Sequence, residues 1–240
     1  MVAHETSDKE SAMTASAPLT SSARPTWERW SPVGGIAFFI LAVVGFGLLN
    51  GGMPSTDAPA RDWISFYSDS GNRAQVLVGA YVTTVAGLAF LWFLAGLRGR
   101  LLLVDRGSSA LSWLVAASGV IFVAMLMAGT VAMASVAGSI TFGNSPVPPA
   151  DFGRQLSQLG FGLVLLASAF FAALFVAATS YLALETGAFA RWLAIVGFIV
   201  AVVVLFSALL IPMIVYLLWV LAVSISLLIR GRSSATAPTS

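Results

Sequence analysis

The sequence predicts an all-α protein, a polytopic transmembrane bundle of six helices with a short amphipathic helix on its outer side. Three observations predict this class. Hydrophobic residues make up 58% of the 240 residues and charged residues only 9%, against roughly 25% charged residues in a soluble domain. The mean hydropathy is high, at +0.93. The apolar residues gather in runs of about 20 residues or more, the length that crosses a bilayer.

The two ends of the chain are expected to be disordered cytoplasmic tails, residues 1–30 and 231–240. The first is rich in Ser, Thr and Ala and has few apolar side chains to bury. The first apolar run starts only at residue 32, and no A-x-A site follows it, so we expect an uncleaved first span rather than a signal peptide. The segment 31–230 is then one transmembrane domain.

Six spans are expected within this domain. They are 32–49, 74–97, 109–136, 158–184, 191–209 and 212–229. The last two share an apolar run with no charge after Arg191, and Pro212 near its midpoint suits the first turn of a new helix. The charge-free run 107–150 leaves a second hidden span open as an alternative. The turn-forming cluster GNSPVPP at 143–149 favours a loop there.

The distribution of arginine predicts the orientation in a plasma membrane. One side of the six-span arrangement holds Arg24, Arg29, Arg98, Arg100, Arg106, Arg191, Arg230 and Arg232, and the other holds Arg61, Arg73 and Arg154. Because basic residues are retained on the cytoplasmic side, both termini are expected in the cytoplasm. Trp92, Trp113 and Trp192 fall near the predicted cytoplasmic helix ends, as an aromatic belt does. The segments 51–73 and 139–157 then face outward.

The outer segment 51–73 is the longest polar interruption and carries a helical pattern. Its apolar side consists of Trp63, Phe66, Tyr67 and Ser70, at spacings i, i+3, i+4 and i+7. Asp57 is expected as the N-cap, with Pro59 in the first turn and Gly71 at the end. This predicts a short amphipathic helix. It is expected to lie on the outer leaflet or across the mouth of the bundle, either as an interfacial element that packs and orients the protein or as a lid for a ligand or partner.

The second outer segment leads into a long helix. Asp151 is expected as the N-cap of a helix that continues to Leu184, which is longer than the hydrocarbon layer of about 30 Å. Either its first turns stand outside the membrane, or Gly160 and Gly162 bend it. The two outer segments together suggest a candidate outer vestibule, with solvated loop charges as the alternative interpretation. Its candidate residues are Asp62, Trp63, Tyr67, Asp69, Asn72, Arg73, Asp151, Arg154 and Gln158.

The sequence lacks the residues that several functional classes require. No ionisable residue falls inside a proposed span, which argues against a pump or an ion-driven carrier. The chain has no cysteine, and its one histidine, His4, lies in the N-terminal tail, so we expect no metal site, no cofactor and no catalytic group. Nucleic-acid patches and phosphate loops are also missing.

Polar and small residues within the spans suggest how the helices pack. The hydroxyls that could line a facilitator or lipid groove, or bond to their own helices, are those of Tyr81, Thr83, Thr84, Ser118, Thr130, Ser168, Thr179 and Tyr216. Small residues recur at four-residue spacing in Gly79, Thr83 and Gly87, in Ala124, Ala128 and Ala132, and in Ala169, Ala173 and Ala177. Such spacing lets helices approach closely, so the second, third and fourth spans are expected at the packed centre.

Four segments carry a resemblance to a known family. They are WERW at 27–30, FYSDSGNR at 66–73, FLWFLAGLR at 90–98, and AATSYLALETG at 177–187 followed by RWL at 191–193. Over residues 27–230, the chain resembles an uncharacterised actinobacterial family of six-helix integral membrane proteins. The resemblance implies a helical bundle in the inner membrane, and it assigns no activity and no functional residue.

Two hypotheses for function remain open. The first is a structural or accessory membrane subunit that binds a partner or lipid. The second is a small-molecule or lipid facilitator with the outer vestibule as its mouth. The expected partners are membrane lipids, with either another membrane protein or a second copy of the chain as a homo-oligomer. A continuous polar stripe through the bundle centre would favour the facilitator, and a dry, closely packed centre would favour the accessory subunit.

Overall fold

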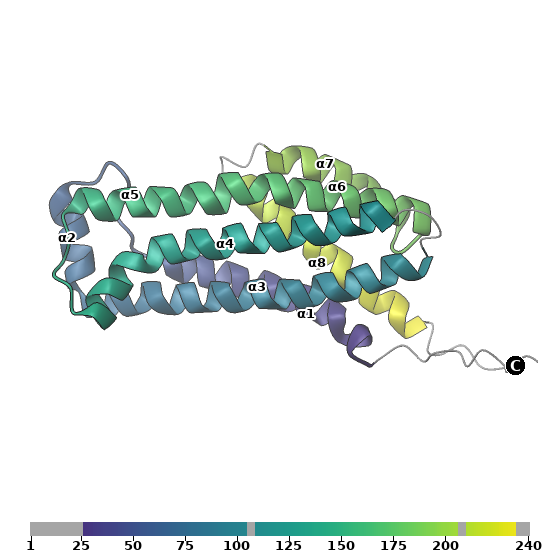
Figure 1. Ribbon diagram of the computed structural model, residues 1–240, viewed down its shortest axis with the longest axis horizontal. Coiled ribbons are helices and arrows are strands. Elements are labelled where there is room, and N and C mark those ends of the chain that lie inside the picture. The colour runs from purple at the N-terminus through teal and green to yellow at the C-terminus, as the bar shows by residue number, and fades with distance from the viewer. Residues whose placement is uncertain (1–25, 105–108, 206–209, 234–240) are drawn as a thin grey trace, which may run out of the picture.

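The computed structural model describes residues 26–104, 109–205 and 210–233, and these form a bundle of nearly parallel helices (Figure 1). No β-strand occurs in the described ranges. The helices are α1 (Thr26–Asn50), α2 (Ala60–Ser68), α3 (Ser70–Val104), α4 (Ser109–Gly143), α5 (Ala150–Phe161), the π-helix η1 (Gly162–Ala167), α6 (Ser168–Thr186), α7 (Arg191–Leu205) and α8 (Leu210–Ser233).

Five of these helical segments are long and apolar enough to cross a membrane, which indicates a multi-pass membrane protein. The five candidate spans are Trp30–Asn50, Ser70–Leu101, Ala110–Gly143, Ala150–Thr186 and Met213–Arg230. The prediction of six full spans is therefore confirmed only in part. The expected span 191–209 is a helix of 15 residues, α7, and residues 206–209 lie outside the described ranges. At 1.5 Å per residue the described part of α7 is about 22 Å long, against about 30 Å for the hydrocarbon layer.

Helix boundaries differ from the expected spans mainly because helices continue beyond the apolar run. α1 begins at Thr26, so residues 26–30, expected in the tail, are helical. Residues 1–25 and 234–240 of the expected tails lie outside the described ranges. The run 107–150 hides no second span, since α4 ends at Gly143 and a loop follows, as GNSPVPP predicted. Pro212 lies in the first turn of α8, as expected.

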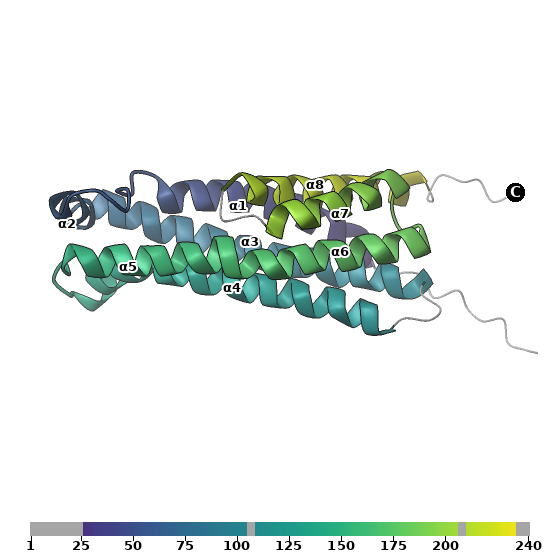
Figure 2. The same cartoon turned by 90° about the horizontal axis from the view of Figure 1, so that it is seen from above.

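The bundle has two distinct ends. At one end α2 lies across the ends of the long helices, whereas α7 and α8 occupy the half remote from α2 in both views (Figures 1 and 2). The remote end carries Arg98, Arg100, Arg191 and Arg230. It also carries the exposed rings of Trp92, Trp113 and Trp192, and the Arg98 guanidinium lies 4.3 Å from the Trp113 ring centroid. We call these the α2 end and the arginine end.

The larger buried cluster, which we call the membrane core, is centred on five aromatic rings. These are Phe38 of α1, Phe90 of α3, Phe122 of α4, Phe175 of α6 and Tyr216 of α8. Neighbouring rings meet edge to face, with centroids 4.9 Å apart for Phe38 and Phe90, 5.2 Å for Phe90 and Phe122, and 5.0 Å for Phe122 and Tyr216. Such pairs are worth about 0.5–1.5 kcal/mol each beyond the area that they bury. The cluster therefore joins five helices across the bundle centre.

Small residues bring particular helices into backbone contact. A Cβ at Gly34 of α1 would lie 2.7 Å from the Ala89 carbonyl oxygen of α3, and one at Gly129 of α4 would lie 2.7 Å from the carbonyl oxygen of Gly160 in α5. Contacts this short leave no room for a side chain, so the glycines fix α1 against α3 and α4 against α5. α1, which the sequence left outside the packed centre, is thus among the most closely packed helices.

The three predicted stripes of small residues differ in burial. Gly79, Thr83 and Gly87 are buried, as are Ala169 and Ala173. By contrast, Ala124 and Ala128 are exposed on the outer surface of α4, so this stripe does not pack within the chain. Four-residue spacing marks a face of small residues but does not say which way that face points.

The smaller buried cluster, which we call the head core, lies at the α2 end. It consists of Leu49, Trp63, Phe66, Tyr67, Val76, Met133, Ala134, Val136, Ala137 and Ala150. These residues come from α1, α2, α3, α4 and α5. The fold thus has two separate cores along its length rather than one.

Helix lengths predict that the head core stands outside the hydrocarbon layer. α3 and α4 have 35 residues each, or about 52 Å, and a tilt of 40° still leaves about 40 Å along the membrane normal. A layer about 30 Å thick takes about 20 helical residues. Counted from Trp113 at the arginine end, that distance reaches Met133, and counted from Trp30 it reaches Asn50. The head core begins at these same levels, so the break between the two cores coincides with the expected membrane boundary.

Candidate functional site

The α2 end is closed by aromatic side chains rather than open. Trp63 and Tyr67 are only 1% and 2% exposed, and Phe66 is buried beside them. A Cβ at Gly153 of α5 would lie 3.1 Å from the Tyr67 ring, so the glycine lets α5 approach α2 closely. The predicted amphipathic helix is therefore confirmed, and its apolar face points into the bundle. Burial also raises the pKa of the Tyr67 phenol to about 12.

Polar residues predicted for a vestibule instead stabilise the two ends of the junction between α2 and α3. Arg73 donates hydrogen bonds from Nη1 to the carbonyl oxygens of Tyr67 (2.7 Å) and Ser68 (2.8 Å), where α2 ends. Asn72 donates from Nδ2 to the Phe66 carbonyl (3.3 Å). The Asp69 carboxylate accepts a hydrogen bond from the Asn72 backbone N–H (2.8 Å), which caps the first turn of α3.

The predicted caps at three sites are therefore displaced. α2 ends at Ser68 rather than at Gly71, which lies in the first turn of α3. The N-cap of α2 is Pro59, and the pKa of Asp57 is held below its usual value by a hydrogen bond from the Ser55 side chain. The N-cap of α5 is Pro149, with Asp151 in the first turn. In both helices the proline sets the extended backbone before the first turn, and the nearby aspartate makes a different contact.

The remaining vestibule candidates do not converge on one another. Arg154 donates to the Ala58 carbonyl (2.8 Å) and pairs with exposed Asp151 (3.0 Å), which ties α5 to the loop before α2. Asp62 is exposed and pairs with Arg61 at 3.4 Å, and Gln158 is exposed. Within the described ranges, no hydrogen bond or ion pair links Asp62 or Asp69 to Arg154. The structure thus divides the predicted set into buried rings, backbone-capping side chains and exposed charges.

An open depression lies beside α2 at this end, with a volume of about 510 Å³. Its walls are Gly52, Pro54, Ser55, Ala58, Asp62, Ser65 and Phe66. Among the described residues, no group of three or more His, Cys, Asp or Glu side chains could hold a metal ion. Asp62 is its only charged side chain, so the depression offers little to fix a ligand.

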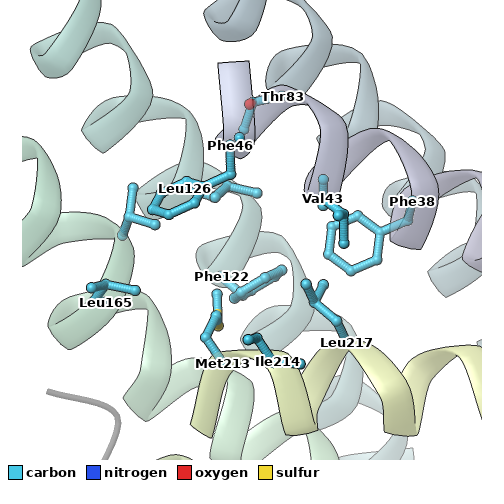
Figure 3. A pocket seen from close by; sticks show the side chains of 13 residues that line it. Phe38, Val43, Phe46, Thr83, Phe122, Leu126, Leu165, Met213, Ile214 and Leu217 are labelled. Carbon is cyan, nitrogen blue, oxygen red and sulfur yellow. The ribbon is translucent and has the colours of Figure 1, made fainter. Parts of the chain in front are cut away.

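A second cavity lies deeper in the bundle and has a volume of about 210 Å³ (Figure 3). Five elements contribute its walls: α1, α3, α4, η1 and α8. The lining residues are Phe38, Ala42, Val43, Phe46, Gly47, Thr83, Phe122, Leu126, Val164, Leu165, Met213, Ile214 and Leu217. Figure 3 shows the side chains of Phe46, Leu126 and Leu165 on one side of the space and those of Val43, Ile214 and Leu217 on the other.

The walls of this cavity are apolar throughout. Its one hydroxyl, on Thr83, donates a hydrogen bond to the Gly79 carbonyl of its own helix (2.8 Å) and is not available to a ligand as a donor. A dry, hydrocarbon-lined cavity of about 150 Å³ in another protein binds benzene or xenon. The present cavity therefore has the chemistry and size to accept a hydrocarbon group and offers no partner for a polar one.

The rim of the cavity reaches the surface of the bundle. Val43 of α1 and Ile214 of α8 are 50% and 48% exposed, and Gly47 beside them is exposed. A Cβ at Gly47 would meet no atom within 4 Å, so the space beside this glycine is open. Val164 and Leu165, on the opposite wall, belong to the π-helix η1, which has a wider turn than an α-helix. η1 begins at Gly162, where the sequence suggested that the long helix could bend.

The other hydroxyls predicted to line a groove do not form a polar path among the described residues. Those of Thr84, Ser118 and Thr130 donate to carbonyls of their own helices. Ser168 does the same to Val164 within the π-helical segment. Thr179 and Tyr216 are buried, and Tyr81 is exposed. The centre of the bundle is thus mainly aromatic, and the buried hydroxyls of Thr179 and Tyr216 have no hydrogen-bond partner among the described residues.

Comparison with known proteins gives no match. No protein-family model matches the sequence, and no curated protein or solved structure is significantly similar to it. The resemblance to an actinobacterial six-helix family therefore stays a prediction, and the site has to be interpreted from its own geometry.

The sequence offered little that could have revealed the apolar cavity. Its lining comes from segments as far apart as Phe38 and Leu217, and every lining residue is also an ordinary residue of a membrane span. Gly47 is the one weak signal, because a glycine in an apolar helix costs helix stability unless something must approach it. What the sequence could not show is that no described residue lies within 4 Å of a Cβ placed there.

Proposed function

We propose that this protein is a non-catalytic accessory protein of the membrane that binds an apolar ligand in the cavity between α1, α4, η1 and α8. The observation that carries the proposal is a hydrocarbon-lined space of about 210 Å³ with an exposed rim on a membrane bundle. Ligand sites are typically the well-formed apolar pockets of a protein. The mainly aromatic centre supports a binding role over a conducting one.

The alternative function, a facilitator with a polar outer mouth, has less support. Trp63, Phe66 and Tyr67 fill the position where its mouth would lie. The arginines predicted to line that mouth hold backbone carbonyls instead. A path for a polar solute would need polar groups along its length, and several of those in the described spans, such as Thr84, Ser118 and Thr130, bond to their own helices.

Native mass spectrometry of the protein released from lipid nanodiscs tests the proposal. The wild-type protein should retain a bound apolar molecule or lipid. Gly47→Phe should reduce the bound fraction by about tenfold or more, equivalent to at least about 1.4 kcal/mol, because the new ring enters the open space of the cavity. The matched control is Gly162→Phe, since a Cβ there also meets nothing within 4 Å and Gly162 does not line the cavity.

Two results would contradict the proposal. One is a wild-type protein that retains no ligand under conditions in which other lipid contacts survive. The other is a bound fraction that Gly47→Phe and Gly162→Phe reduce equally, because the ligand would then lie elsewhere.

A further inference from the structure

We infer that the cavity takes a single acyl chain of a membrane lipid, and that the chain enters sideways from the leaflet on the α2 side. This inference rests on the proposed function and adds the ligand, the route and the leaflet. Three observations carry it: the depth of the cavity, the position of its mouth, and its size and apolar lining.

The depth of the cavity follows from helix rise along four independent helices. At 1.5 Å per residue, Val43 lies about 20 Å from Trp30 in α1, and Thr83 lies about 22 Å from Arg98 in α3. Leu126 lies about 20 Å from Trp113 in α4, and Ile214 lies about 24 Å from Arg230 in α8. The midplane of a hydrocarbon layer about 30 Å thick lies about 15 Å from either surface. Phe38 and Phe122, which also line the cavity, lie about 12 Å from Trp30 and about 14 Å from Trp113, close to the midplane. With the helices near the membrane normal, the cavity therefore extends from the midplane into the half of the membrane nearer to α2.

The mouth of the cavity opens onto the acyl-chain region of the membrane. The rim residues Val43, Gly47 and Ile214 are exposed and lie within the candidate spans Trp30–Asn50 and Met213–Arg230. The mouth is thus continuous with the lipid-facing surface of the bundle rather than with water. The head core lies beyond this level and closes the bundle at the α2 end. A water-borne ligand would have to cross lipid to reach the cavity, whereas an acyl chain is already beside it.

The start of α8 forms one wall of the cavity. Met213 and Ile214 lie in the first turns of α8, which is described from Leu210 onward. In Figures 1 and 2, α1 and α4 continue toward α2 beyond the level where the described part of α8 begins. The cavity therefore lies beside the first turns of α8, between this helix and the walls from α1, α4 and η1.

The size and chemistry of the space favour one chain over a whole lipid. About 210 Å³ exceeds the cavity that accepts a benzene ring, which suits part of one hydrocarbon chain. No charged residue lines the cavity, so the polar headgroup is expected to stay in the membrane interface. Because basic residues are retained on the cytoplasmic side, the arginine end is expected in the cytoplasm. The α2 end then faces outward, and the lipid is expected to come from the outer leaflet.

A photoreactive lipid tests both the route and the leaflet. The probe is a phosphatidylcholine with a diazirine in the middle of one acyl chain, added to one face of sealed vesicles that contain the protein. The orientation is measured in the same vesicles with Ser68→Cys, because Ser68 is exposed at the α2 end and the chain has no other cysteine. Probe added on the α2 side should label peptides that contain residues 42–47 or 213–217, as located by mass spectrometry.

The matched variants separate cavity labelling from general lipid contact. Gly47→Phe should lower labelling of these two peptides by about tenfold, and Gly162→Phe should leave it unchanged. Probe added on the arginine side should label them far less. Equal or stronger labelling from the arginine side, or labelling that Gly47→Phe does not change, would overturn the inference. If native mass spectrometry still shows a ligand that Gly47→Phe removes, the proposed function survives and only the acyl-chain inference fails.

Discussion

The membrane core and the head core share three helices but are stabilised by different interactions. In the membrane core, Phe90 contacts the rings of Phe38, Phe122 and Phe175, and several buried hydroxyls, such as that of Thr130, bond to their own helices. In the head core, an amphipathic helix buries three aromatic side chains, and arginines bond to carbonyls that would otherwise lack a partner.

The difference follows from the two solvents. Lipid tails are as apolar as the side chains, so association within the membrane depends on close packing and dispersion rather than on the hydrophobic effect. Water surrounds the head, so burial of Trp63, Phe66 and Tyr67 is driven by the hydrophobic effect, and free helix ends must find partners. The sequence carries the same distinction, because α2 and α5 are amphipathic whereas α4 and α6 are apolar on all sides.

The largest expected effect comes from removing the central side chain of the head core. Trp63→Ala should destabilise the head by about 3–5 kcal/mol, because it empties the space of a fully buried ring. Hydrogen exchange followed by mass spectrometry should then show faster exchange in α2 and in α5, with exchange in the membrane part of α3 unchanged. The control in the other region is Phe175→Ala, which should lower the thermal midpoint without raising exchange in α2. If Trp63→Ala loosens all helices equally, the two cores are not independent.

A smaller effect is expected from the arginine that caps α2. Arg73→Met should cost about 1.5–3 kcal/mol in local stability of α2, because two carbonyl oxygens lose a charged donor. Arg61→Met is the matched control, because Arg61 is 85% exposed and its ion pair with Asp62 contributes little. Exchange rates in the last turn of α2 report the difference. Equal effects of the two substitutions would mean that the capping bonds do not hold the head.

The smallest effect at neutral pH is expected at Tyr67. Its hydroxyl is buried and has no hydrogen-bond partner among the described residues, so Tyr67→Phe should change stability by less than about 1 kcal/mol at pH 7. The phenol has a pKa of about 12 when folded and about 10 when unfolded, so the unfolded state loses its proton first as the pH rises. Wild-type stability should therefore fall by about 1.4 kcal/mol per pH unit between pH 10 and 12.

The variant provides the control for this pH dependence. Thermal midpoints measured at pH 9 and pH 11 should fall further in the wild-type protein than in Tyr67→Phe. If both proteins lose the same stability, the ring is not buried as the head core requires.

Much of the fold could be predicted because lipid imposes strong periodicity and length rules. The apolar runs located every long helix, and the spacing of Trp63, Phe66 and Tyr67 predicted α2, while leaving open whether its apolar face met lipid or the bundle. The expected span 191–209 corresponds to α7, described as Arg191–Leu205, and its last expected residues lie outside the described ranges. Composition alone does not locate a helix end within such an apolar run.

The site could not be predicted to the same extent. Arg73 and Arg154 were candidate site residues because the chain has few charges. Their partners are backbone carbonyls, which the sequence does not reveal. The cavity depends on what is missing beside Gly47, and an absence of neighbours has no sequence pattern. Only the relative placement of α1, η1 and α8 reveals it.

The membrane boundary along α4 tests the central claim, that the head core stands outside the hydrocarbon layer and the cavity lies within it. Single cysteines on the exposed face of α4 would be reacted with a water-soluble maleimide in nanodiscs, which leave both membrane faces accessible. Cysteines at Ser139 and Phe142 should react readily, and those at Ala124 and Ala128 should not, because Met133 marks the expected boundary. Reaction at Ala128 together with protection at Ser139 would contradict the claim.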